Sequence, residues 1–432
     1  MDKNQSIVNV DAEKVTTDLA NSTISNTAND LKENADVSTF PMPRTLPLRP
    51  PPDYARLRKE NPISKAKIWD GSLVWLVTRH HDVSKALTDP HFSKVRTHPG
   101  FPETGPGGKA AAHAGKPTFV DMDPPEHTRH RGMVEQDFTK EKAEEMRPKI
   151  QQIADKILDE MLTKAQPVDL LASFALPVPT LVIYHMLGVP YEDHEFLDTC
   201  NAIRTNGSAT SAESARASKD LMDYLARLVD KKTQNPTNDI ISRLAIEQVQ
   251  TSKLTHDELV AMSFLLLVAG NATTANMIAL GTLTLLQHPD QLAELRRDPS
   301  LIKNAVEEIL RYVTGSQFAT RRLALEDVEI GGQIIKKGEG VWALNASANE
   351  DEDVFSNATR FDIHRQPNPH LAFGDGIHVC IAQDLARVEI QIAIETLIRR
   401  LPNLQLAVPA DELQYVTIPK RDFGVAALPV KW

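Results

Sequence analysis

Apolar residues recur at helical spacing over most of the chain. Met146, Ile150, Ile153, Ile157 and Met161 follow one another at intervals of four, three, four and four residues. This is the period of a helix that has one apolar face. The pattern therefore predicts a mainly helical protein in which this segment forms one amphipathic helix.

A second helix is predicted from Thr255 to about Gln287, because Thr255 and Glu258 have the spacing of a capping box. Residues 259–289 contain no Asp, Glu, Lys or Arg, so a membrane span is one interpretation. Polar residues such as Asn271 interrupt the stretch, however. A helix that is apolar on all sides in a large protein usually lies in its core, and we favour a core helix.

Short strands are predicted near both ends of the chain. Asp70-Gly71 is a tight-turn signal between two apolar runs and predicts a hairpin over residues 68–77. Further strands are predicted at residues 328–335 and 341–345, and a last helix at 382–400. Residues 91–117 are rich in Gly, Pro, Lys and His and predict a long loop, which in a compact domain is usually functional.

Composition and charge limit the class of protein. The chain has 432 residues, 41% of them apolar, which is enough for a large core. A net charge of -10 argues against non-specific nucleic-acid binding. The only cysteines, Cys200 and Cys380, form no CxxC pair, which argues against a disulfide framework, a zinc ribbon and a c-type haem.

The first 40 residues contain seven acids, three Lys and no Arg, and they have no apolar centre. These features fit neither a secretory signal nor a mitochondrial presequence. We therefore predict a disordered acidic and polar tail over residues 1–44 and one folded domain over residues 45–432. The expected location is the cytoplasm, with the mitochondrial matrix as an alternative.

The segment from Phe373 to Cys380 is the strongest chemical signal. Gly374 and Gly376 permit a tight loop. Cys380 follows the loop at the entrance of the last predicted helix, where free N–H groups favour a thiolate over a thiol. A thiolate ligates iron in one class of haem enzymes, and Phe373 is placed to shield its sulfur. The alternative is a buried, inert cysteine, which is our interpretation of Cys200.

At these residues the chain resembles the cytochrome P450 superfamily. The family pattern FGxGxHxCxGxxLAR reads FGDGIHVCIAQDLAR here, and it departs at one position, where Ala382 replaces Gly. The resemblance implies a mainly α, single haem-thiolate domain with a small β-sheet region. It also implies haem b as the cofactor, with Cys380 as the axial iron ligand.

Other residues take their roles from the same resemblance. Glu308 and Arg311 match the ExxR pair, and Arg365 matches its partner in the loop that precedes the cysteine. The expected haem-propionate ligands are His127, Arg131, Arg322 and His378.

Further segments, among them FLLLVAGNAT and NMIALG, resemble the fungal nitric oxide reductase branch. Ala272 also stands where most monooxygenases place an acid before the central threonine. This branch converts two nitric oxide molecules to nitrous oxide and water. It takes hydride directly from NADH or NADPH, so no reductase protein, membrane or nucleic acid is expected as a partner.

The resemblance assigns residues to this chemistry as well. The expected cations for the dinucleotide phosphates are Lys94, Arg96 and Arg321, beside Arg322. Lys109 or His113 is placed to pair with a 2′-phosphate, so NADPH is expected to work alongside NADH. The expected proton route consists of Thr273, Ser316 and Asp422.

Two alternatives stay open from the sequence. One is a soluble monooxygenase supplied with electrons by a ferredoxin or flavoprotein, and the other is a haem-based gas sensor. The sequence does not indicate an oligomeric state.

Overall fold

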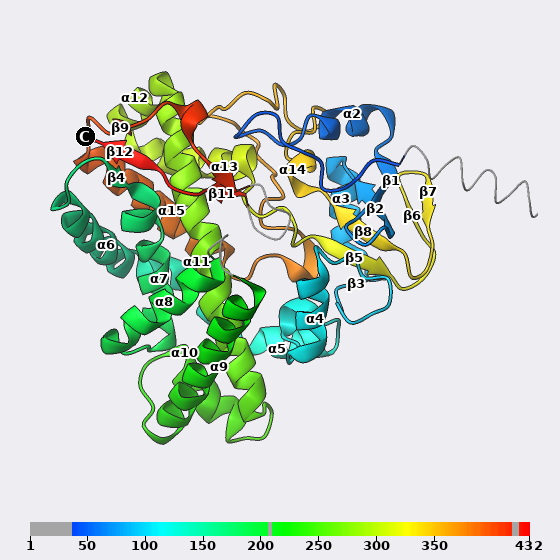
Figure 1. Ribbon diagram of the computed structural model, residues 1–432, viewed down its shortest axis with the longest axis horizontal. Helices are drawn as coiled ribbons and strands as arrows, with labels where there is room; N and C mark the ends of the chain where they lie inside the picture. Colours follow the sequence, from blue (N-terminus) through cyan, green and yellow to red (C-terminus); the bar gives the residue numbers. More distant parts are fainter. Residues whose placement is uncertain (1–36, 206–209, 417–422) are drawn as a thin grey trace, which may run out of the picture.

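The computed structural model describes residues 37–205, 210–416 and 423–432. Helices fill one side of the molecule, and most of the strands gather on the other side (Figure 1). The chain forms, in order, the helices α2 (Asp53–Glu60), α3 (His80–Thr88), α4 (Pro106–Ala114), α5 (Glu126–Val134), α6 (Lys140–Leu162), α7 (Pro177–Leu187), α8 (His194–Thr205), α9 (Ser211–Gln234), α10 (Ile240–Leu244), α11 (His256–Gln287), α12 (Pro289–Arg297), α13 (Ile302–Val313), α14 (Asn345–Ala348) and α15 (Gln383–Arg400).

Helix α11 runs through the middle of the molecule (Figure 1). Its first turn is closed by the predicted capping box, in which Thr255 and Glu258 bond each other's backbone N–H groups. It packs against α7, α9, α13 and α15. Its length and apolar composition also match a membrane span. These contacts on all sides confirm the prediction of a core helix and explain why its sequence has no charged face.

The strands are short and form four small sheets. They are β1 (Ile63–Lys67), β2 (Leu73–Val77), β3 (Phe92–Ser93), β4 (Val168–Asp169), β5 (Arg321–Ala324), β6 (Val328–Ile330), β7 (Gln333–Ile335), β8 (Gly340–Ala343), β9 (Gln405–Leu406), β10 (Tyr415–Val416), β11 (Gly424–Val425) and β12 (Pro429–Lys431). The largest sheet has the order β1-β2-β8-β5-β3, and its β2 and β8 are parallel while its other neighbours are antiparallel. The mainly α fold with a small β region is therefore as predicted.

Two local predictions need correction. The supposed long loop over residues 91–117 contains β3 and the helix α4, whose Gly-rich sequence hides its helical character. Residues 37–44 pack on the domain, because Phe40 is buried and its ring lies 4.8 Å from that of Trp342. The rest of the predicted tail, residues 1–36, lies outside the described residues.

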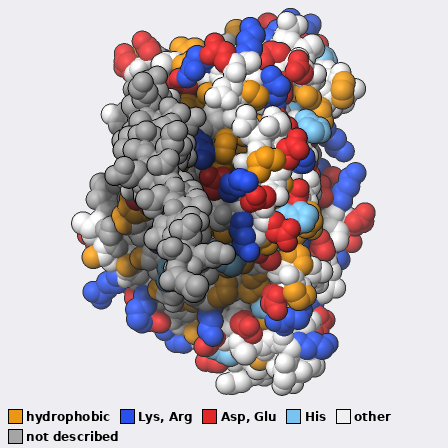
Figure 2. All heavy atoms as spheres, turned by 90° about the vertical axis from the view of Figure 1, so that its right-hand side faces the viewer, with side chains coloured by type: hydrophobic (Ala, Val, Ile, Leu, Met, Phe, Trp, Pro, Cys, Tyr) orange, Lys and Arg blue, Asp and Glu red, His pale blue; other side chains and the backbone are white. Residues whose placement is uncertain are grey.

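The face that carries the five-stranded sheet has a mixed charge. Where side chains are described, Figure 2 shows Lys and Arg intermixed with Asp and Glu. One example is Lys65 in β1, whose Nζ lies 3.0 Å from Oε1 of Glu339, the residue just before β8. Basic groups on this part of the surface are thus balanced locally by acids.

We predict that Thr255→Ala lowers the free energy of unfolding by about 1 kcal/mol, because it removes the side-chain acceptor of the capping box. Thr199→Ala is the matched control. Thr199 is exposed within α8 and bonds only to the Glu195 carbonyl one turn earlier, so its loss should change stability by less than about 0.5 kcal/mol. Urea unfolding of both variants checks this, and equal midpoints would contradict it.

Candidate haem site

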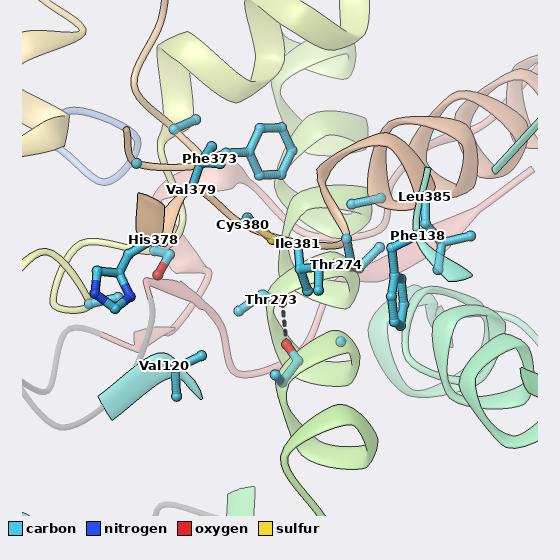
Figure 3. A pocket seen from close by; sticks show the side chains of 18 of the residues that line it. Val120, Phe138, Thr273, Thr274, Phe373, His378, Val379, Cys380, Ile381 and Leu385 are labelled. Atoms are coloured by element: carbon cyan, nitrogen blue, oxygen red, sulfur yellow. Dashed lines mark hydrogen bonds between the residues drawn. The ribbon is translucent and has the colours of Figure 1, made fainter. Parts of the chain in front are cut away.

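A cavity of about 440 Å³ lies between α11 and the loop that carries Cys380. Helix α11 contributes Leu265, Ala269 and Thr273, which are four residues apart and so share one face. Figure 3 shows Cys380 and Phe373 on one side of the space and Thr273 on the other. The volume is in the range of pockets that hold cofactors and small molecules.

The cysteine loop has the tight geometry that its glycines predict. Gly374 and Gly376 have φ values of 77° and 69°, in the left-handed region. A Cβ on Gly376 would come within 2.8 Å of the Leu87 carbonyl oxygen, so a larger residue cannot be accommodated there without a shift. The Cys380 N–H donates to the Phe373 carbonyl at 3.0 Å, which fixes the sulfur and the ring in the same loop.

Opposing effects act on the Cys380 thiol. Burial raises its pKa, and the Ala382 backbone N–H, Arg131 and Arg387 lower it less strongly. A metal ion bound directly to the sulfur would supply positive charge that favours the thiolate. Among the described residues, no three His, Cys, Asp or Glu side chains lie together to hold a bare ion.

The four expected propionate ligands come together at one edge of the cavity. Arg131, Arg322 and His378 line it, and His127 lies behind them with its ring 4.4 Å from that of His378. The Lys94 side chain joins them in the cavity wall. These groups come from α5, β5, the cysteine loop and the segment after β3, so only the tertiary fold brings them together.

This cluster has an excess of positive charge. Burial and the neighbouring Arg322 lower the pKa of His378 to about 2, and burial lowers the pKa of Arg322 itself to about 10. Both ring nitrogens of His127 are buried without a hydrogen-bond partner among the described residues. The buried Arg322 cation needs an anion to compensate it, and the His127 ring needs a hydrogen-bond partner.

A haem fits these observations. Its two propionates would meet the buried cations, and its iron would meet the Cys380 sulfur. When bound, a haem with a thiolate ligand supplies an iron centre for redox chemistry on small molecules in the cavity. Phe373, which also lines the cavity, is placed to keep water from the sulfur.

The ExxR pair is a buried network. Glu308 has no exposed side-chain surface and accepts hydrogen bonds from Arg311 at 2.7 Å on both oxygens. Arg365 adds a third bond to Glu308 at 3.0 Å. The structure therefore brings together the three residues as the family pattern predicts.

The predicted dinucleotide cations Lys94, Arg96 and Arg321 lie close enough that, besides burial, the two arginines lower the pKa of Lys94, but of the three only Lys94 lines the cavity. Arg96 and Arg321 both pair with Glu103, at 2.5 and 2.6 Å, and neither lines the cavity. Lys94 is buried and donates to the Ala319 carbonyl. Arg96 and Arg321 therefore share the single negative charge of Glu103, and their assignment to a nicotinamide cofactor stays a prediction.

The predicted proton route is described only in part. Thr273 and Ser316 both line the cavity. The Thr273 hydroxyl donates a hydrogen bond to the Ala269 carbonyl at 2.9 Å, so the hydroxyl oxygen can still accept a hydrogen bond from another group. Asp422 lies outside the described residues.

Sequence reasoning missed three acids near the site. Glu103 is described above. Asp123 accepts bonds from the Ser93 hydroxyl at 2.5 Å and the Lys94 N–H at 2.9 Å. Glu389 lines the cavity from α15, and burial raises its pKa well above the ordinary value. Of these three acids, only Glu389 could have been identified from the sequence, because it lies four residues after Leu385 on a helix face that is otherwise apolar.

Comparisons with known proteins agree with this site. The family described as Cytochrome P450 matches residues 209–412. The relative "Cytochrome P450 55A3" of Fusarium lichenicola is 49% identical, over 93% of this chain and 98% of its own length. The "Vitamin D3 dihydroxylase" of Streptomyces griseolus is 40% identical, over 93% and 98%.

Solved structures have the same fold. The structure of GfsF, whose sequence is from Streptomyces halstedii, has a TM-score of 0.88 and 44% identity, and it covers 92% of this chain and 100% of its own. The methyl hydroxylase MycCI of Micromonospora griseorubida, bound to mycinamicin VIII, has a TM-score of 0.85 and 39% identity over 92% and 100%.

These findings correct the prediction that no reductase protein is required. Two of the similar proteins are named as hydroxylases. A hydroxylation that puts one atom of dioxygen into substrate and the other into water consumes two electrons. The described sheets contain a single parallel strand pair, β2–β8, and no Rossmann unit to bind a dinucleotide.

We predict that Arg322→Gln and Arg131→Gln each weaken haem binding by about ten- to a hundredfold. Each loses a charge-assisted hydrogen bond worth roughly 1.5–3 kcal/mol, and about 1.4 kcal/mol is a factor of ten. Arg129→Gln is the control, since Arg129 is on the same helix but bonds to the Lys253 carbonyl. Titration of apoprotein with haem, followed at the Soret band, measures the affinities. Equal affinity in all three variants would refute the propionate assignment.

Proposed function

This chain belongs to the cytochrome P450 family, and from that premise we propose that it is a haem-thiolate monooxygenase that receives electrons from a separate redox protein. The observation that carries the proposal is the apolar cavity wall beside the Cys380 loop. Leu265, Ala269 and Val120 line it together with the Thr273 hydroxyl. Such a wall suits an apolar organic substrate, because it offers burial and few polar contacts.

The chain's own residues have distinct parts in this reaction. Cys380 would hold the haem iron, and the buried cations would hold the propionates. The Thr273 and Ser316 hydroxyls supply hydrogen bonds on the α11 side of the cavity, where protons must arrive. One atom of dioxygen is inserted into an accessible C–H bond of the substrate. The other atom combines with two protons and two electrons to form water.

Electrons are proposed to enter through the loop that carries Cys380. Ile377 is 50% exposed although it is large and apolar, and it lies three residues before Cys380. We propose this side chain as a contact for the redox protein because it is both exposed and three residues from the iron ligand. NADH or NADPH is proposed as the ultimate electron source, through that partner. A cytoplasmic location is part of the same proposal.

A second candidate is the reduction of nitric oxide to nitrous oxide. Ala272 supports it, because the position just before Thr273 lacks an acid that would deliver protons to dioxygen. The 49% identical relative from Fusarium, a fungal source, also supports it, since the sequence resembles the fungal branch. The two candidates share the haem site and differ in the molecule that is reduced.

One experiment with two gas conditions separates the candidates. The holoprotein is mixed with NADH, a ferredoxin and its reductase. Under oxygen, with vitamin D3 or mycinamicin VIII as probes, the monooxygenase proposal predicts a low-spin to high-spin shift and a product that carries one atom of labelled oxygen. Under anaerobic nitric oxide, the second candidate predicts one nitrous oxide for two nitric oxide molecules.

The outcomes are distinct. Labelled product with little nitrous oxide supports the first candidate. Nitrous oxide at catalytic rates, without oxygenated product, overturns the first candidate in favour of the second. Heat-treated holoprotein is the control for chemical reduction of nitric oxide in both conditions.

We predict that Ile377→Asp slows the reduction of the iron by ferredoxin about tenfold, because it places a charge at the proposed contact. Ile334→Asp is the matched control, since Ile334 is 47% exposed in β7 and belongs to the separate β6–β7 hairpin. Stopped-flow measurement with ferredoxin tests this, and reduction by dithionite should be unchanged in both variants. Equal ferredoxin rates would rule out this face.

A further inference from the structure

The ring of Phe373 packs against Arg387, which forms an ion pair with Glu307, and neither member of this pair lines the cavity. Phe373 lines the cavity beside Cys380, and its carbonyl accepts the Cys380 N–H. The Arg387 guanidinium lies 4.6 Å from the centroid of the Phe373 ring, which is a cation–π contact. The ring therefore contacts a fixed positive charge in the same loop that carries the sulfur (Figure 3 shows the positions of Phe373 and Cys380).

Arg387 is held in this position by Glu307. Its Nε and Nη2 donate to the two carboxylate oxygens at 2.8 and 3.2 Å. His370, which is 3% exposed, bonds to the same carboxylate at 3.0 Å. A forked pair of this kind fixes the plane of the guanidinium as well as its distance. The ring thus has little freedom to move away from the sulfur.

Both members of the pair carry a charge. Burial acts to raise the pKa of Glu307, but hydrogen bonds from His370 and Arg387 bring it down to about 2. The Arg387 charge lies over the Phe373 ring, and the Phe373 carbonyl accepts the Cys380 N–H, so the charge is close to the iron ligand. The charges of Arg387 and Glu307 therefore oppose each other close to the iron ligand.

We propose that Arg387 and Glu307 are positioning residues that set the reduction potential of the haem iron, through the Phe373 ring and through their opposed charges. This inference rests on the haem-thiolate part of the proposed function. A positive charge near the iron and its sulfur stabilises the ferrous state, which has one more negative charge than the ferric state. The negative charge of Glu307 has the opposite effect.

The test uses the full chain loaded with haem. Glu307→Gln leaves the Arg387 charge unbalanced, so the potential should become more positive. Arg387→Gln leaves the Glu307 charge unbalanced, so the potential should become more negative. We expect each variant to change the ratio of ferrous to ferric iron at a fixed solution potential about tenfold, which is 59 mV for one electron. Redox titration followed in the visible spectrum measures both.

Two controls separate charge from structure. Glu144→Gln and Arg147→Gln remove a pair of similar forked geometry on α6, which lines no part of the cavity, and should leave the potential unchanged. Arg387→Lys keeps the charge but loses the fork, so its potential should lie closer to that of the unmodified protein than that of Arg387→Gln. Arg387→Lys also provides a test at this position if Arg387→Gln does not fold.

The outcomes are distinguishable. Shifts of opposite sign support the proposal. Shifts of the same sign in both variants, or no shift, overturn it, because a merely structural role would loosen the ring in the same way in each. If the ferrous carbon monoxide complex of the unmodified protein lacks the red-shifted Soret band of a thiolate ligand, the proposed function fails instead.

Discussion

The placement of the iron-ligating loop depends on one buried carboxylate, that of Glu308. A carboxylate without exposed surface is costly unless its oxygens are saturated, and here Arg311 and Arg365 saturate them. Arg311 also donates to the carbonyls of Asn349 and Ala358, in the long segment that leads to the Cys380 loop. All of these partners are needed to compensate the buried charge of Glu308. The network therefore fixes the backbone position of the segment that precedes the Cys380 loop.

The neighbouring Glu307 extends this constraint to the other side of the loop. It bonds to His370, just before Phe373, and to Arg387, on the helix that follows Cys380. Two consecutive glutamates on α13 therefore hold the segment before the cysteine and the helix after it. The geometry around the sulfur is fixed from α13, and the Cys380 backbone adds the bond from its N–H to the Phe373 carbonyl.

Features that depend on local spacing were predictable from the sequence. The capping box of α11, the glycine loop before Cys380 and the Glu308–Arg311 pair all use residues a few positions apart. The pairing of Arg96 and Arg321 with Glu103 could not be predicted in this way, because the fold places Glu103 between residues 225 positions apart. The effect of burial on the Cys380 thiol could not be predicted either, since burial is a tertiary property.

The two candidate functions use the same residues on the cysteine side. Cys380, Phe373 and the buried cations would serve either reaction, so their agreement with the family pattern supports the haem site equally under both. The reaction is decided across the cavity, on α11. There the apolar face around Ala269 favours an organic substrate, while Ala272 removes the acid that dioxygen chemistry uses. The apolar face has the greater weight, because Thr273 and Ser316 still offer hydroxyls through which water can carry protons.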